Sequence, residues 1–94
     1  MDQTIVDDAQ RSRFELHVDG HLGAFAEYVR GDGVITFTHT VTLPSHRGQG
    51  LAGVLVREAL DRSRDAGLRV VPRCPYVAKF IGDHPEYADL VRQQ

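Results

Sequence analysis

The sequence predicts a mixed α/β domain: an antiparallel meander of three strands, then a β–α–β unit that adds a parallel fourth strand, then C-terminal helices. Three observations lead to this prediction. Residues 14–18 alternate between apolar and polar side chains, two more β-rich stretches follow between glycine turns, and a helical period begins after residue 50. A chain of 94 residues can bury one modest core, so we expect residues 1–94 to form a single domain.

The first twelve residues are polar and show no clear period. They carry several charges, at Asp2, Asp7, Asp8 and Arg11. We expect residues 1–12 to form a loose lead-in.

Three β-rich stretches form the expected meander. In the first, Phe14, Leu16 and Val18 alternate with polar residues, which is typical of a half-buried strand. The second covers residues 22–30, and a Gly-Asp-Gly turn connects it to the third. The third, residues 34–43, is rich in β-branched side chains and stops at a proline.

An amphipathic helix is predicted for residues 51–66, where apolar residues recur at helical spacing. Arg62 and Arg64 suit the negative end of its dipole, and Gly67 can take the left-handed conformation that ends a helix. Residues 68–71 then form a short apolar strand, which should return parallel to the third strand.

Two short helices complete the prediction. Pro75 suits a helix start, and the apolar face that follows is interrupted at Gly82 and Pro85. A final short helix is expected over residues 86–91.

Charge and composition exclude several functions. The net charge is −2 and the chain has no basic run, so nucleic acid is not an expected partner. No apolar run reaches the length of a membrane span and the N-terminus does not resemble a signal peptide, so we expect a cytoplasmic protein without a membrane partner. The single cysteine, Cys74, cannot form an internal disulfide, and no histidine or acidic partner stands at ligand-like spacing from His84, so we expect no metal.

The most informative segment joins the third strand to the first helix and contains Gly48 and Gly50. Glycines let backbone N–H groups converge on an anion, the helix N-terminus adds partial positive charge, and Arg47 adds a full charge. The glycines could instead serve only a tight turn. The segment lacks the Gly-Lys-Ser/Thr of a Walker loop and the third glycine of a dinucleotide fingerprint, which disfavours nucleoside triphosphates and NAD.

This segment resembles the acetyl-CoA signature of the GNAT superfamily, Arg/Gln-x-x-Gly-x-Gly/Ala, at Arg47, Gly50 and Ala52. Three further segments resemble a subgroup of very small GNAT-like proteins: residues 39–42, 71–77 and 84–87. The resemblance spans roughly residues 13–90.

The resemblance implies a minimal GNAT fold that binds acetyl-CoA, with the end of the third strand along the pantetheine arm and the loop at the pyrophosphate. The helix from Pro75 would flank the thiol end. The cofactor-binding residues that follow from it are Thr40, Val41, Thr42, Arg47, Gly48, Gln49, Gly50, Leu51, Ala52, Cys74, Pro75 and Tyr76.

Three residues are candidates for catalysis. Cys74 lies at the expected carboxyl end of the fourth strand, where a helix start at Pro75 would favour its thiolate; the alternative is a small core cysteine. His39 could act as a general base toward an amine, or simply bond to a backbone carbonyl. Tyr76 could protonate the leaving thiolate, as could Tyr87, or each could serve packing alone.

Two functions of different class remain open. The first is an N-acetyltransferase that moves an acetyl group from acetyl-CoA to an amine on an unknown acceptor. The chain lacks the long helical segment and the closing strands of full-length GNAT enzymes, so its acceptor groove should be open, which suits a protein or peptide. The second is a non-catalytic acetyl-CoA-binding module or a carrier acetylated on Cys74. A domain whose glycine loop binds nothing is a third possibility, and we expect a monomer or weak dimer.

Overall fold

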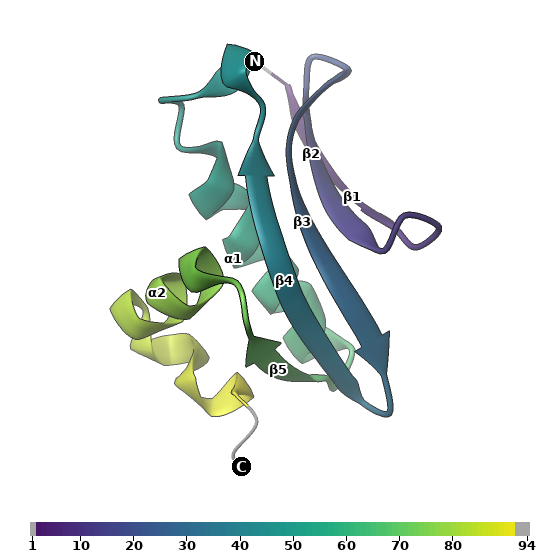
Figure 1. The fold of residues 1–94 in the computed structure, drawn as a ribbon, viewed down its shortest axis with the longest axis vertical. Helices are drawn as coiled ribbons and strands as arrows, with labels where there is room; N and C mark the ends of the chain where they lie inside the picture. The colour runs from purple at the N-terminus through teal and green to yellow at the C-terminus, as the bar shows by residue number, and fades with distance from the viewer. Residues whose placement is uncertain (1, 92–94) are drawn as a thin grey trace.

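The computed structural model describes residues 2–91, and its strands form one sheet in the order β1-β2-β3-β4-β5 (Figure 1). Neighbouring strands are antiparallel from β1 to β4, and β4 and β5 are parallel. The strands are β1 (Gln3–Asp8), β2 (Arg13–Val18), β3 (His21–Gly31), β4 (Val34–Thr42) and β5 (Arg69–Pro72). The predicted fold class, a meander followed by a parallel β–α–β unit, is confirmed.

Strand β1 corrects the prediction of a loose lead-in over residues 1–12. It pairs along its whole length with β2, in a register that places Ile5 opposite Leu16 and Val6 opposite Glu15. As the edge strand it buries little, so most of its side chains are exposed and its sequence has no apolar alternation. The side chain of Arg62 donates to the carbonyl oxygen of Ile5 at 2.9 Å, which ties this edge to α1.

One face of the sheet forms the core against α1 (Leu51–Asp65). The helix is amphipathic, and its apolar residues pack on β2, β3 and β4. As predicted, it ends before a glycine with positive φ, Gly67 at 72°. The buried residues that line this face and the helix include Phe14, Leu16, Ala24, Ala26, Ile35, Phe37, Leu55, Val56 and Leu60.

The C-terminal elements lie at the β5 edge of the sheet, beside α1 (Figure 1). Helix α2 (Pro75–Asp83) continues through Gly82, where the sequence predicted a break, because glycine is costly but permitted in a helix. The predicted final helix is the 3-10 helix η2 (Pro85–Leu90). Among residues 2–91, none of the helices has the length and apolarity needed to cross a membrane.

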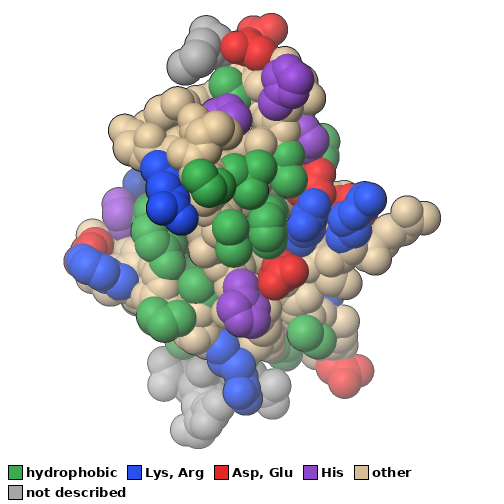
Figure 2. All heavy atoms as spheres, turned by 45° about the horizontal axis from the view of Figure 1, so that its top comes forward, with side chains coloured by type: hydrophobic (Ala, Val, Ile, Leu, Met, Phe, Trp, Pro, Cys, Tyr) green, Lys and Arg blue, Asp and Glu red, His purple; other side chains and the backbone are tan. Residues whose placement is uncertain are grey.

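Within residues 2–91, no helix covers the second face of the sheet (Figure 1). Cross-strand pairing places Arg13, Glu15, Phe25 and Val41 on this face, and Val41 is partly exposed. We call it the open face. On the side of the molecule that Figure 2 shows, hydrophobic side chains gather near the centre beside Lys or Arg and His side chains.

Candidate functional site

Strand β5 pairs along its whole length with β4, but β4 pairs with β5 only over its first half. The parallel register runs from Val34 opposite Arg69 to Phe37 opposite Pro72, and the N–H of Cys74 then donates to the carbonyl of Phe37 at 2.9 Å. Beyond this point β4 continues to Thr42 while the chain turns into α2 (Figure 1). The end of β4 therefore has a free edge on the side of β5. We call the space beside this edge the β4–β5 gap.

The backbone groups that face this gap follow from the alternation of an antiparallel ladder. The N–H of Leu43 donates to the carbonyl of Gly23 at 2.9 Å, so Val41, two residues earlier, also faces β3. The N–H and C=O groups of Thr40 and Thr42 then point into the gap. An extended ligand that carries amides could hydrogen-bond to this edge as an added strand does.

The glycine loop lies between β4 and α1, after the short 3-10 helix η1 (Pro44–His46). Gly48 and Gly50 have positive φ values, 83° and 72°, and a β-carbon on either would meet nothing within 4 Å. Gly50 is the N-cap of α1 and contributes no side chain, and the first turn of α1 has no acidic residue. The N–H groups at the start of α1 therefore remain available to an anion.

The close contact that supports this loop was not predicted from the sequence. A β-carbon on Gly23 would lie 3.0 Å from Cδ1 of Leu51 and 3.5 Å from Cδ2 of His46. The last residue of η1 and the first residue of α1, which flank the glycine loop, therefore rest directly on the backbone of β3. A glycine inside a β-rich stretch is the signal that could have indicated this close approach.

Cys74 lies at the mouth of the gap, as the N-cap of α2, and is 4% exposed. Its sulfur is 3.4 Å from the Oγ1 of Thr40, so the two residues meet across the gap. Pro75 follows as the first residue of α2. The structure thus brings Thr40, Cys74 and the start of α2 together.

Tyr76 extends from α2 toward the first turn of α1. A β-carbon on Gly53 would lie 3.6 Å from the Tyr76 hydroxyl, and the side chain of Tyr76 is exposed. Gly53 and Tyr76 also line a hollow between the two helices together with Lys79, Phe80, Asp83 and His84. The hollow reaches the first turn of α1 at Gly53.

His39 lies on the other side of the sheet from Cys74. A bulge in β4 causes this: Phe37 pairs with Tyr28 and His39 with Glu27, which leaves Thr38 as an extra residue. Phe37 and Thr40 therefore face the helices, whereas His39 lies on the open face. Its side chain is 71% exposed, and its Nδ1 is 3.4 Å from Oε1 of Glu27.

Tyr87 and His84 make contacts within the fold. Tyr87 is buried, donates to Asp61 at 2.7 Å and accepts from Arg57 at 3.3 Å; burial and the Asp61 carboxylate raise its pKa. His84 bonds to the carbonyl of Phe80 at 2.7 Å and stacks on its ring. Within residues 2–91, no group of three or more His, Cys, Asp or Glu side chains is placed to hold a metal ion.

The mixed five-stranded sheet, antiparallel from β1 to β4 and with β5 parallel to β4, matches the GNAT fold. The family profile described as "GCN5-related N-acetyl-transferase" matches residues 13–90. This chain therefore belongs to that family.

Relatives and solved structures agree with this assignment. The chain is 33% identical over 90 residues to Protein NATD1 of Bos taurus, which covers 93% of this chain and 79% of the relative. A GCN5-like protein from Staphylococcus aureus superimposes with a TM-score of 0.72 at 18% identity, over 97% of this chain and 89% of its own.

A ribosomal-protein-alanine N-acetyltransferase from Brucella melitensis shares the fold with a TM-score of 0.60 at 19% identity. The match covers 87% of this chain but 62% of that enzyme. The Brucella enzyme thus has a substantial part to which nothing in this chain corresponds.

Proposed function

We propose that this chain binds acetyl-CoA and transfers its acetyl group to an amine of a protein or peptide. The proposal depends on one arrangement: the β4–β5 gap opens directly beside the uncapped N-terminus of α1. The gap suits an extended amide-bearing arm, and the helix start suits a pyrophosphate. Coenzyme A carries both chemical groups in one molecule.

The residues that would hold the cofactor fall into two sets. The N–H groups at the start of α1, at Leu51 and Ala52, and the side chain of Arg47 would bind the pyrophosphate, while Gly48 and Gly50 allow its close approach. The free edge of β4 at Thr40 and Thr42 would bind the pantetheine arm. The thioester end would then lie near Cys74.

Acetyl-CoA supplies an activated acyl group, so the protein has to orient the thioester, take a proton from the amine and give one to the leaving thiolate. The hydroxyl of Tyr76 is the candidate donor to the departing thiolate, because it is exposed next to the first turn of α1. His39 is the candidate base, and its place on the open face requires the amine to approach from that side. Cys74 could act as a transient acyl acceptor, since its sulfur adjoins the gap.

An open acceptor side favours a macromolecular acceptor. No helix of the described residues covers the open face, on which His39 lies, so little of this part of the chain could enclose a small amine. A protein or peptide would bring its own surface and exclude water from the reacting groups.

Titration calorimetry with acetyl-CoA, CoA and ATP tests the proposal. We expect acetyl-CoA and CoA to bind and ATP to bind much more weakly, because ATP lacks the pantetheine arm. Absence of acetyl-CoA binding by a folded sample would refute the proposal.

Mass spectrometry after incubation with acetyl-CoA then distinguishes an acetyltransferase from a carrier acetylated on Cys74. A stable acetyl adduct that disappears in Cys74→Ser, with no transfer to peptide amines, would support the carrier instead. Transfer to a lysine peptide that survives in Cys74→Ser would exclude an obligatory cysteine intermediate.

A further inference from the structure

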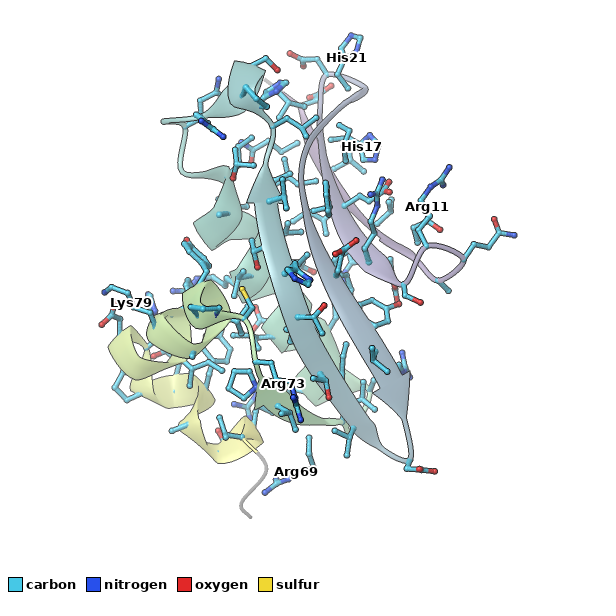
Figure 3. The ribbon with its side chains drawn as sticks, in the orientation of Figure 1. Arg11, His17, His21, Arg69, Arg73 and Lys79 are labelled. Atoms are coloured by element: carbon cyan, nitrogen blue, oxygen red, sulfur yellow. The ribbon has the colours of Figure 1, made fainter. Side chains whose placement is uncertain are left out.

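The open face has a cationic end that the proposed chemistry does not use. Arg69 and Arg73 lie on β5 and just after it, and the side chain of Arg73 lies on the open side of the sheet (Figure 3). Both residues are exposed. This end of the face lies below the β4–β5 gap in Figure 1, away from the glycine loop.

Most other basic side chains are neutralised within the fold. Arg11, Arg13, Arg57, Arg62, Arg64 and Lys79 each form an ion pair with a carboxylate. Among the described residues, no ion pair involves Arg69 or Arg73. The carboxylate of Asp89 is held by Arg64 through two hydrogen bonds, of 2.7 and 2.9 Å; these bonds lower its pKa, and the charge of Arg69 acts in the same direction.

An apolar row lies beside these arginines on the same face. The register places Val29 opposite Thr36 and Thr36 opposite Val71, so these three side chains form a row across β3, β4 and β5. Val34 pairs with Arg69 in the next row. Val29 is 66% exposed, the largest exposure among the exposed large hydrophobic residues of the described chain.

The acidic residues near this row do not neutralise it. Glu27 faces His39 at 3.4 Å, and Asp32 lies at the tip of the β3–β4 hairpin. A shallow hollow at the hairpin end of this row is lined by Val29, Val34 and Thr36 and by the hairpin residues Arg30, Gly31 and Asp32, so that the one carboxylate in its lining is accompanied by a guanidinium group. The β5 half of the open face is therefore apolar, weakly hollowed and positively charged.

We infer that this surface, the Val29–Arg73 face, docks an extended acidic segment of a partner protein. Apolar side chains of the segment would cover Val29 and Val71, and its carboxylates would pair with the Arg69 and Arg73 guanidinium groups. Charge complementarity selects this occupant over a second copy, because two copies would bring four arginines together. The inference does not depend on acetyl-CoA, since none of these residues belongs to the cofactor site.

Fluorescence anisotropy measures the binding of a labelled peptide of alternating glutamate and valine to the chain and tests this inference. The lysine–valine counterpart of the peptide is the control. We expect the acidic peptide alone to bind, and the Arg69→Glu/Arg73→Glu double variant to bind it about tenfold more weakly. The Arg69→Lys/Arg73→Lys variant should keep most of the affinity. Arg11→Glu makes the same kind of charge change at the opposite edge of the sheet, near β1 (Figure 3), and should leave peptide binding unchanged.

Three results would overturn the inference. Equal binding of both peptides would show that charge does not select the partner, and undiminished binding by the charge-reversed variant would place the contact elsewhere. Sedimentation that shows a dimer, lost in Val29→Asp, would assign the face to a second copy. Circular dichroism and the acetyl-CoA titration, run on each variant, confirm that the fold and the cofactor site are intact.

Discussion

The hydroxyl of Thr40 and the sulfur of Cys74 lie 3.4 Å apart and join β4, beyond its last residue paired with β5, to the N-cap of α2. This contact fixes the width of the β4–β5 gap at its narrow end. Above it, only the backbone of β4 lines the gap on one side. The proposed contact of β4 with acetyl-CoA is therefore made by its backbone, and removing one backbone N–H tests it.

Thr42→Pro should weaken acetyl-CoA binding about tenfold, because it removes an N–H that points into the gap and one hydrogen bond to the ligand. The ladder to β3 should survive, because Thr42 does not donate to it. Val41→Pro is the matched control: it removes a ladder donor and should lower the melting temperature instead. Calorimetry and thermal melts separate the two effects, and an unchanged affinity in Thr42→Pro would exclude the free edge as a cofactor contact.

Ala52→Glu should change stability and binding in opposite directions. A carboxylate in the first turn of α1, which has none, favours the helix dipole and should add about 0.5 kcal/mol to the unfolding free energy. The same charge should repel a pyrophosphate and reduce acetyl-CoA affinity by more than about tenfold. Urea unfolding and calorimetry measure both quantities.

Ala52→Gln controls for the size of the new side chain, because it lacks the charge. If it reduces affinity as much as Ala52→Glu does, bulk rather than charge is responsible. A substitution at Gly50 would be harder to interpret, because its φ of 72° would strain any other residue.

The fold was predictable wherever one side of an element is buried and the other exposed. The alternation of Phe14, Leu16 and Val18 and the helical period of α1 are local signals, and both elements lie where expected. Strand β1 has no such signal, because its side chains are largely exposed. Backbone pairing with β2 holds it in the sheet instead. An edge strand of this kind can be recognised only once its partner is known.

The candidate site was predictable as a set of residues but not as an arrangement. Simple alternation from Phe37 would place His39 on the helix face, and the one-residue bulge at Thr38 moves it to the open face instead. The bulge depends on pairing with β3, which no local pattern in β4 reveals. The separation of His39 from Cys74 therefore emerged only from the structure.

Gly23→Ala should damage both the fold and the site, because the new methyl group would lie 3.0 Å from Leu51 and 3.4 Å from Val18. We expect a loss of about 1–3 kcal/mol of unfolding free energy in urea, and weaker acetyl-CoA binding as α1 shifts. Gly82→Ala is the matched control, since a methyl group there meets nothing within 4 Å and alanine favours the helix. Equal stability of Gly23→Ala and the unmodified chain would show that the start of α1 does not pack closely on Gly23 of β3.

Alkaline pH should destabilise the chain through Tyr28. Burial, together with the hydrogen bond that the Tyr28 hydroxyl donates to the Asp7 carboxylate, raises the pKa of Tyr28 from 10.0 to about 12. The unfolded chain releases this proton near pH 10 and the folded chain retains it, so the unfolding free energy should fall as pH rises from 10 to 12. Urea unfolding across this range should show a shallower fall in Tyr28→Phe, whereas Tyr76→Phe, which alters an exposed tyrosine, should keep the original slope. An identical slope in Tyr28→Phe and the unmodified chain would mean that Tyr28 ionises equally in both states.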